Sequence, residues 1–416
     1  MAETDGTIED GVIDDPRRLA WIVVSGCLIC LLTFGPRSAV GLFMQPMSVD
    51  FGWSRDVFSL AFALQNLLWG IAQPICGSIA DRYGSMRVIC LGALAYAAGL
   101  LLMQHAGSPL LLNAGMGVLV GFGLSGCSFT LVLAAFGKLL PQGWRAIALG
   151  AGTAAGSLGQ FLFAPLGAAL IDTLGWAAAL KAFAALILLV VPLSLAFMRP
   201  RASVQLTSPS GGQGLIGAIR QALSHRSYVL LVVGFFTCGF QLAFITVHLP
   251  AYLVDRGLSA QIGGWVIALI GLFNIFGALG AGWLANDRVP KRYLLAVIYL
   301  VRALATLAFV TLPISPMSAL MFGIVTGLAW LSAVPPTSGL VAVMFGTRWL
   351  STLWGVAFLS HQVGGFLGAL LGGLIFEKFG SYLPAWWLSV ALGLASALIN
   401  LPIVEKPAVR GAPQHA

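Results

Sequence analysis

Long runs of apolar residues alternate along this chain with short polar breaks. Phe58–Ile79 and Val88–Met103, for example, contain no charged residue. About 20 consecutive apolar residues are enough for a helix to cross the hydrocarbon core of a membrane. The chain contains twelve such runs and is therefore predicted to form twelve transmembrane helices. The runs lie at about residues 20–45, 57–79, 86–105, 109–138, 145–171, 176–198, 228–254, 262–285, 292–312, 317–345, 351–376 and 382–403.

The widest polar break divides these runs six and six. It extends from Arg199 to Arg226 and is rich in Ser, Gly and basic residues, a composition typical of flexible linkers. We therefore expect an all-α membrane protein built from two six-helix halves. The expected parts are an N-terminal cytoplasmic tail (1–19), a first six-helix domain (20–198), a cytoplasmic linker (199–227), a second six-helix domain (228–403) and a C-terminal cytoplasmic tail (404–416).

The two halves also share a weak internal repeat. Gly77–Asp81 is echoed in the second half by Gly282–Asn286, and Gly159 is echoed at the same offset by Gly364. Self-similarity at a fixed offset is the mark of a duplicated structural unit. The repeat therefore supports two halves of the same fold.

Composition places most of the chain in lipid. Of its 416 residues, 59% are hydrophobic and 9% are charged, whereas soluble domains contain about 25% charged residues. The net charge of +8 comes from single basic residues scattered between apolar runs, so it favours contact with membrane lipid and not with nucleic acid. All six cysteines lie inside apolar runs and are interpreted as packing residues.

Lys and Arg residues predict the orientation of the bundle. Sixteen of them lie in the tails, the linker and the loops on one side, and four lie in the loops on the other side. Basic residues accumulate on the cytoplasmic side of membrane proteins, so we expect both termini in the cytoplasm. The first 16 residues hold six of the 14 acidic residues and no apolar run, and they do not resemble a signal peptide. The protein is thus expected to be a multi-pass protein of a bacterial inner membrane.

A short charged turn separates the second and third apolar runs. Its sequence, GSIADRYGSMR (Gly77–Arg87), has the pattern G-x-x-x-D-R-x-G-x-x-R. This pattern resembles the loop between helices two and three of the major facilitator superfamily. In that family the Asp and Arg side chains tie neighbouring helix ends together in one transport state, so the resemblance implies a gating loop. Its residues are Gly77, Asp81, Arg82, Gly84 and Arg87. The alternative is an ordinary basic cytoplasmic loop.

Two arginines, Arg37 and Arg302, lie inside apolar runs. A cation in this position is costly unless it is paired or meets water, and is a functional candidate by default. The carboxylates outside the N-terminal tail all lie in loops or at the ends of runs, so none is placed to pair with either arginine inside the membrane. An unpaired guanidinium attracts an anion and binds a carboxylate through two parallel hydrogen bonds.

The sequence around Arg37 reads FGPRSAVGLFMQPM (Phe34–Met47). It resembles the monocarboxylate-porter branch of the superfamily, which includes oxalate–formate exchangers. The segments Val247–Ser259, Ile298–Ala305 and Gly327–Ser338 resemble bacterial relatives in the same branch. In the animal members, a basic residue between proline and serine in the first helix contacts the substrate carboxylate. The resemblance implies this role for Arg37.

The eighth helix departs from the family pattern. Many relatives carry an arginine there, shortly before a charged loop, and in the animal carriers it follows an aspartate by four residues. Asn274 and Ala278 stand at these places in this chain. The second anion contact of the family is therefore missing, and a particular substrate does not carry over. Arg302 either replaces this contact or braces the carbonyl groups of neighbouring helices.

Several uncharged or weakly basic residues inside the runs are further candidates for substrate contact. Gln241 and His248 are seven residues apart and share a helix face, and His361 lies on the same face as a stripe of glycines that begins at Gly364. Other candidates are Gln65, Asn66, Asn274 and Trp330. The alternative role for each is a hydrogen bond between helices.

These observations predict a monomeric secondary carrier that moves a small organic anion, a monocarboxylate or short dicarboxylate, by alternating access. The mode of coupling is left open between proton symport and anion exchange. Because no carboxylate lies in mid-membrane, a coupling proton would travel on His248, His361 or the substrate itself. The alternatives are an efflux permease for a neutral or amphipathic compound and a non-transporting membrane sensor. No metal-ligand cluster, phosphate-binding loop or nucleophile–base pair occurs in the sequence, so no enzyme activity, metal or cofactor is expected.

Overall fold

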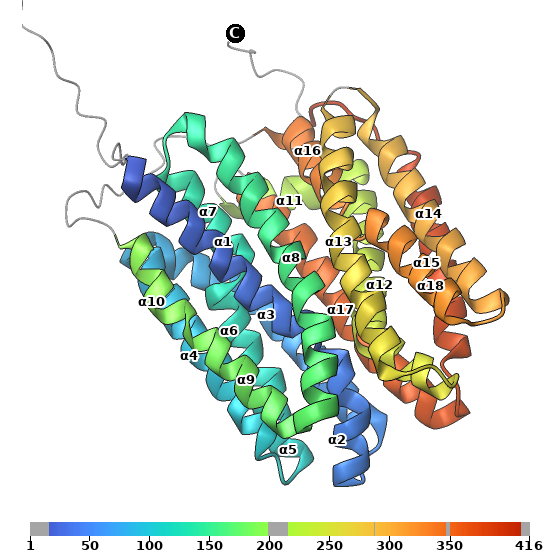
Figure 1. The fold of residues 1–416 in the computed structure, drawn as a ribbon. Helices are drawn as coiled ribbons and strands as arrows, with labels where there is room; N and C mark the ends of the chain where they lie inside the picture. The colour runs from blue at the N-terminus through green and yellow to red at the C-terminus, as the bar shows by residue number, and fades with distance from the viewer. Residues whose placement is uncertain (1–15, 199–214, 287, 347–349, 409–416) are drawn as a thin grey trace, which may run out of the picture.

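The computed structural model describes residues 16–198, 215–286, 288–346 and 350–408. Most of the expected linker (199–214) and parts of the expected tails (1–15 and 409–416) lie outside the described residues. Within the described residues the regular structure is entirely helical. Figure 1 shows long helices side by side, with the N-terminal part of the chain in one bundle and the C-terminal part in another. We call residues 16–198 the first half and residues 215–408 the second half.

The first half contains ten α-helices and three short helical turns. They are α1 (Pro16–Ser38), η1 (Val40–Phe43), α2 (Met44–Phe51), α3 (Arg55–Tyr83), α4 (Ser85–Gln104), α5 (Pro109–Leu112), the π-helical η2 (Asn113–Leu119), α6 (Val120–Cys127), α7 (Phe129–Leu139), α8 (Gln142–Leu174), α9 (Trp176–Leu188), α10 (Val190–Ser194) and η3 (Leu195–Phe197). The described second half contains α11 (Leu215–Leu223), α12 (Arg226–Asp255), α13 (Ala260–Ala285), α14 (Lys291–Thr311), α15 (Pro316–Ala329), α16 (Val334–Phe345), α17 (Leu350–Phe379) and α18 (Leu383–Asn400).

Eleven helical segments in the described residues are long and apolar enough to cross a membrane. Helix α3 is the twelfth long segment, with 29 residues. Its hydropathy is lower because Gln65, Asn66 and Gln73 interrupt its apolar sequence. Together these segments reproduce the twelve helices predicted from the apolar runs.

Two runs predicted as continuous helices are broken in the structure. In the run 109–138, Ser128 has extended backbone angles, with φ −65° and ψ 158°, and separates α6 from α7. In the run 317–345, residues 330–333 separate α15 from α16, directly before Pro335 and Pro336. Proline lacks an N–H donor and clashes with the preceding turn, so a continuous helix is unfavourable there. Prediction from hydrophobic length missed both breaks.

Each half has its own cluster of buried hydrophobic side chains. Phe136 and Phe183 belong to the cluster of the first half, and Trp330 and Trp386 to that of the second. Burial of such large side chains contributes about 1.5–3 kcal/mol each to folding in water, but the lipid-facing surface of a membrane bundle gains no such term. Close packing between helices therefore has to supply the remaining stability.

The glycine stripe of α17 provides such packing. A Cβ atom at Gly364 or Gly368 would collide with the carbonyl oxygen of Phe236 or Phe240 in α12, and one at Gly372 would collide with the His248 ring. Only glycine allows the two backbones to approach this closely. The stripe thus allows close packing of α17 against α12.

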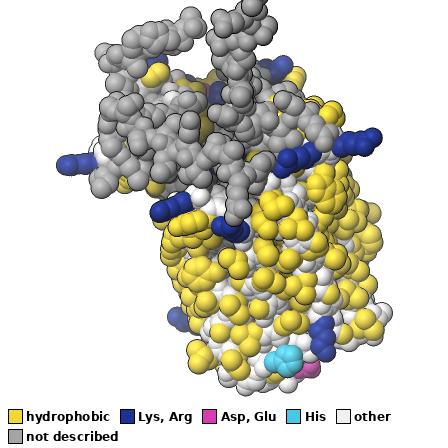
Figure 2. All heavy atoms as spheres, turned by 90° about the vertical axis from the view of Figure 1, so that its left-hand side faces the viewer, with side chains coloured by type: hydrophobic (Ala, Val, Ile, Leu, Met, Phe, Trp, Pro, Cys, Tyr) yellow, Lys and Arg dark blue, Asp and Glu magenta, His cyan; other side chains and the backbone are white. Residues whose placement is uncertain are grey.

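The two ends of the bundle differ in charge. The first and last described residues lie at one end (Figure 1), which we call the terminal end. Figure 2 shows hydrophobic side chains over most of one face of the molecule, with most of the Lys and Arg side chains of this face close to the terminal end. At this end a single glycine, Gly84 with φ +94°, joins α3 to α4. Glycine adopts this left-handed conformation without strain, as the predicted tight turn requires.

Candidate functional site

A cavity of about 390 Å³ lies between the two halves. Helices α1, α3 and α7 line it from the first half, and α12, α16 and α17 line it from the second. Six of the lining side chains are large aromatic groups: Phe34, Trp69, Phe129, Phe235, Trp354 and Phe358. The polar lining side chains are Arg37, Thr130, Ser338, His361 and Gln362.

Arg37 lines this cavity from the last turn of α1. Its Nη2 donates a hydrogen bond of 2.8 Å to Oδ1 of Asn66, while its Nε is buried without a hydrogen-bond partner. The guanidinium carbon lies 4.7 Å from the ring centre of Trp69 and 5.6 Å from that of Phe62. In the described residues no carboxylate pairs with Arg37. The aromatic rings stabilise the cation, and its free N–H groups remain available to an anion.

His361 lies on the opposite wall, in α17. Its Nδ1 is 3.0 Å from Oε1 of Gln362, and Nε2 of Gln362 donates to the backbone oxygen of Asn66 over 3.1 Å. Because the amide nitrogen of Gln362 is the donor to Asn66, its oxygen is the acceptor and Nδ1 of His361 carries the hydrogen. Asn66 and Gln362 thus connect Arg37 in the first half with His361 in the second half.

The remaining predicted substrate contacts do not line this cavity. Arg302 is 2% exposed, and its Nη2 lies 3.4 Å from the backbone oxygen of Cys238. Its Nη1 is buried without a partner. Gln241 donates to the backbone oxygen of Ser389 in α18 over 2.9 Å. These contacts brace neighbouring helices of the second half, which is the structural alternative recognised from the sequence.

Asn274 bridges helices at the interface between the halves. It donates to Oγ of Ser157 over 2.8 Å and accepts from the backbone N–H of Leu331 over 2.9 Å. Gln65 and Trp330 are also buried outside the cavity, with exposed fractions of 1% and 2%. Substrate contact by these three side chains therefore remains a prediction. Asn274 bonds neighbouring segments, and Oε1 of Gln65 is buried without a hydrogen-bond partner.

The aromatic walls of the cavity were missed by sequence reasoning. Leu350, Trp354, Phe358 and Gln362 follow each other at intervals of four residues and therefore share one face of α17. The same spacing is found on any helix that packs against its neighbours. An aromatic residue in an apolar run thus gives no signal that separates a cavity wall from a core.

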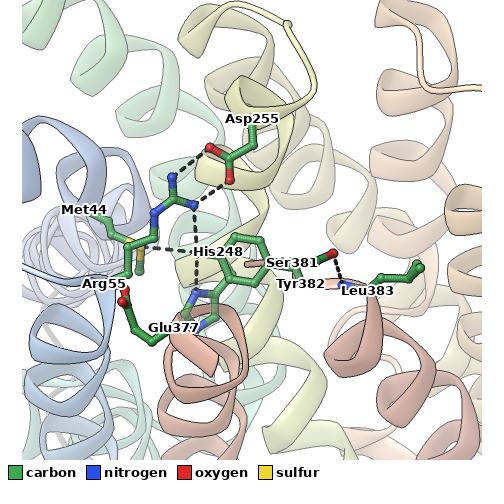
Figure 3. A network of polar contacts seen from close by, with 8 residues as sticks. All are labelled: Met44, Arg55, His248, Asp255, Glu377, Ser381, Tyr382 and Leu383. Carbon is green, nitrogen blue, oxygen red and sulfur yellow. Dashed lines mark hydrogen bonds and ion pairs between the residues drawn. The ribbon is translucent and has the colours of Figure 1, made fainter. Parts of the chain in front are cut away.

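A second polar network joins the halves (Figure 3). It lies where α2 ends and α3 begins, at the end of the bundle opposite the terminal end (Figure 1), which we call the latch end. Arg55 at the start of α3 binds both carboxylate oxygens of Asp255, at 2.5 and 2.7 Å. Its Nη1 also donates to the hydroxyl of Tyr382 over 3.2 Å, and its backbone N–H donates to Glu377 over 2.8 Å. The guanidinium lies 4.0 Å from the ring centre of Phe376. One arginine of the first half therefore contacts α12, α17 and the residue that precedes α18 in the second half.

His248 lies beneath this network and not in the cavity. Its Nε2 is 2.8 Å from the backbone oxygen of Ala369, and its Nδ1 is 3.4 Å from the hydroxyl of Tyr382. A carbonyl oxygen only accepts, so Nε2 carries the hydrogen and Nδ1 is the acceptor. Burial raises the pKa of Tyr382 to about 12, so this hydroxyl stays protonated at neutral pH and can donate.

The contact between the halves is uneven along its length. It involves mainly the pairs α3 with α17 and α8 with α13. A Cβ atom at Gly373, near the latch end, would collide with Ser59, and one at Gly70, near the middle, would come within 2.7 Å of Gln362. Gly77 lies on the same face of α3 as Gly70, and Gly355 on the same face of α17 as Gln362, yet a Cβ atom at either would meet nothing within 4 Å. The halves are thus in contact at the latch end and separate toward the terminal end.

The predicted gating loop lies on the separated side. Arg82 and Arg87 are exposed, and the guanidinium of Arg82 lies 5.4 Å from the ring centre of Tyr83. The side chain of Asp81 is outside the described part of the structure. A role of this loop in another conformation of the protein stays a prediction.

Comparison with known proteins identifies relatives over almost the whole chain. The family model of the Major Facilitator Superfamily matches residues 26–369. An uncharacterized MFS-type transporter, YcxA of Bacillus subtilis, is 27% identical over 94% of this chain and 96% of its own length. Monocarboxylate transporter 13 of Rattus norvegicus is 26% identical over 92% of this chain and 89% of its own. Monocarboxylate transporter 11 of Homo sapiens is 25% identical over 92% and 82%.

The fold is also similar to that of solved structures. A bacterial homolog of the human lysosomal transporter Spinster, in an inward-facing and unoccupied conformation, superposes with a TM-score of 0.73. The two chains are 18% identical, and the match covers 94% of this chain and 96% of the other. At this identity the likeness concerns the fold alone.

Proposed function

Because this chain belongs to the major facilitator superfamily, we propose that it is a secondary carrier of a small organic anion that bears a carboxylate. The observation behind the proposal is Arg37, a cation without a carboxylate partner among the described residues, in a cavity between the two halves. Sequence relatives that are monocarboxylate transporters support the same class of substrate. We also propose that the carrier lies in the cell membrane of a bacterium.

The structure has the features of one state in an alternating-access cycle. The latch end is closed by Arg55, Asp255 and Tyr382, and the cavity reaches from Arg37 toward the terminal end. The excess of Lys and Arg predicts that the terminal end faces the cytoplasm. We therefore assign this conformation to the inward-facing state, in which substrate exchanges with the cytoplasm. Transport then requires the latch to open and the two halves to close at the other end.

Coupling follows from the titratable groups at the cavity. The described lining contains no Asp or Glu, and Arg37 keeps its proton in practice. We propose that a coupling proton travels with the substrate, or that a second anion resets the empty carrier. The alternative to both is a proton carried by His361, which is the titratable histidine of the described cavity lining.

The proposal is tested by binding measurements on the purified carrier and its Arg37 variants. Arg37→Gln removes charge-assisted hydrogen bonds of about 1.5–3 kcal/mol, so carboxylate affinity should fall about 10- to 150-fold. Arg37→Lys keeps the charge but loses the planar fork and should retain part of the affinity. Arg18→Gln is the matched control, because Arg18 is half-buried outside the cavity and donates to the carbonyl of Met198 within the first half. Unchanged carboxylate binding in Arg37→Gln would refute the proposal.

The mainly aromatic lining favours one competing function, export of a neutral or amphipathic compound. In that case Arg37 would be structural, and its replacement would leave the binding of uncharged aromatic compounds intact. The same panel of variants, measured with a carboxylic acid and its amide, separates the two functions.

A further inference from the structure

The size and the walls of the cavity around Arg37, together with its charge, indicate which carboxylates the carrier prefers. We propose that the preferred substrate is an aromatic monocarboxylate, and not a short aliphatic acid or a dicarboxylate. This inference rests on the proposed function, because it requires that Arg37 binds a carboxylate. The argument uses the size of the cavity, its charge and its walls.

The cavity is large compared with a two- or three-carbon acid. Its volume of about 390 Å³ lies within the range of about 300–1,000 Å³ found for sites that enclose drug-sized ligands. A short acid bound to Arg37 would leave most of the apolar wall in contact with water. A ligand with a ring would cover that wall, and each Å² of apolar surface removed from water contributes about 25 cal/mol.

The charge of the cavity suits a single carboxylate. Arg37 is the one Lys or Arg among the described lining residues, and Arg302, the other intramembrane arginine, is buried behind α12. A second carboxylate would therefore enter an apolar, ring-lined space in which no second Lys or Arg among the described lining residues can pair with it. Burial of an unpaired charge is strongly unfavourable. The lining thus selects against dicarboxylates.

The walls consist of aromatic rings from both halves. Trp69 and Phe358 face each other across the interface with ring centres 5.7 Å apart and an angle of 75° between their planes. Phe34 contacts Phe129 in the first half at 6.2 Å, and Phe235 contacts Trp354 in the second half at 5.4 Å. Edge-to-face and offset ring contacts add about 0.5–1.5 kcal/mol per pair beyond the area that they bury. The two rings of each pair are already in contact, so a planar ligand ring packs beside them within the cavity and gains such contacts from both halves, whereas a saturated ring gains only burial.

The wall next to the cation is held in place before any ligand arrives. The indole Nε1 of Trp69 donates to Oε1 of Gln73 over 2.9 Å, and Oγ of Ser128 donates to the same oxygen over 3.0 Å. These bonds fix the indole plane beside Arg37. A fixed wall binds a flat ring without the entropy cost of ordering a side chain, so the geometry favours an arene close to the carboxylate.

The test compares acids that share one carboxymethyl group. Binding to the full-length carrier is measured for acetate, propionate, cyclohexylacetate, phenylacetate and indole-3-acetate, and for 1,4-phenylenediacetate as the dicarboxylate. We expect phenylacetate and indole-3-acetate to bind at least about tenfold more tightly than propionate, and phenylacetate more tightly than cyclohexylacetate and 1,4-phenylenediacetate. Equal or tighter binding of propionate, of cyclohexylacetate or of the dicarboxylate would overturn the inference while leaving the proposed function intact. Binding of indole or toluene without binding of any acid would overturn both.

Two variants assign the effect to the cavity walls. Trp354→Leu and Phe358→Leu should each lower the ratio of phenylacetate to propionate affinity several-fold. Trp265→Leu is the matched control, because this tryptophan lies outside the cavity and is 47% exposed. The ratio of phenylacetate to propionate affinity in this variant should equal that of the wild type. If one wall variant fails to fold, the other variant and the ligand series on the wild type still decide the question. An unchanged ratio in a folded wall variant would contradict the inference.

Discussion

Removal of one carboxylate at the latch end should shift the carrier toward its other conformation. In Asp255→Asn, Arg55 loses the ionic partner that it binds through two hydrogen bonds. The two side chains are 15% and 29% exposed, so the pair lies between an exposed pair, worth about 0.2–1 kcal/mol, and a buried pair, whose disruption costs about 3–5 kcal/mol. We therefore take about 1–2 kcal/mol as the free energy by which Asp255→Asn destabilises the closed conformation.

This free energy applies only while the latch is closed, because opening separates Arg55 from Asp255. The ratio of the open to the closed conformation should therefore rise about 5- to 30-fold in Asp255→Asn. Arg55→Gln should have a larger effect, since it also removes the hydrogen bond to Tyr382. In the double variant the effects should be less than additive, as expected for residues in direct contact.

Double electron–electron resonance between two spin labels across the latch end measures the ratio of the open to the closed conformation. Val49, 75% exposed, and Lys378, also exposed, are suitable sites in the first and second halves once the six cysteines are replaced. Asp50→Asn is the matched control, because Asp50 accepts a hydrogen bond from Trp176 within the first half. A distance distribution in Asp255→Asn identical to that of the control would refute the latch.

Three further outcomes are expected. Asp81→Asn should lower the maximal transport rate more than it changes equilibrium binding, because the loop is distant from the cavity; loss of binding with normal turnover would contradict a gating role. In proteoliposomes with an imposed pH gradient, His361→Gln should still accumulate substrate, and loss of this drive with exchange retained would identify a histidine relay. Gly368→Ala should lower the free energy of unfolding by about 1–3 kcal/mol, because its Cβ would collide with the carbonyl oxygen of Phe240. Gly355→Ala should leave it unchanged, because a Cβ atom there meets nothing within 4 Å. Equal unfolding free energies for the two variants would contradict the packing argument.

The fold could be predicted because its main determinant is visible in the sequence. The length and spacing of apolar runs set the number of membrane-crossing helices, and Gly84 marks the turn between α3 and α4. The break at Ser128 was missed, because an apolar run looks the same whether or not it bends, whereas Pro335 and Pro336 mark the second break in the sequence. Of the polar residues that lower the hydropathy of α3, Asn66 bonds Gln362 of the other half, and Gln73 accepts hydrogen bonds from Trp69 and Ser128 within the first half.

The candidate site was predicted only in part. Arg37 stood out because a charge in an apolar run is rare, and it lies in the cavity as expected. Arg302 stood out for the same reason, yet it contacts Cys238 inside the second half. A buried polar side chain can face a cavity or another helix, and sequence does not give the rotation of a helix within a bundle that is buried on several sides. The candidates Gln241 and Asn274 were subject to the same ambiguity.

The latch was not predicted because its members are ordinary loop charges in the sequence. Arg55 and Asp255 lie at the ends of α3 and α12, and Glu377 lies near the end of α17. Nothing local indicates that three charges so far apart in the chain meet. Only the packing of the two halves brings them together, and the same packing leaves the cavity between the halves on the side toward the terminal end.

Saturable uptake of a labelled carboxylate into proteoliposomes tests the central claim most directly. The claim is that Arg37, between the two halves, binds the carboxylate of a transported anion. The wild-type carrier should show saturable uptake that other monocarboxylates compete for, and Arg37→Gln should insert into the membrane normally but lose this uptake. Normal uptake kinetics in Arg37→Gln would contradict the account.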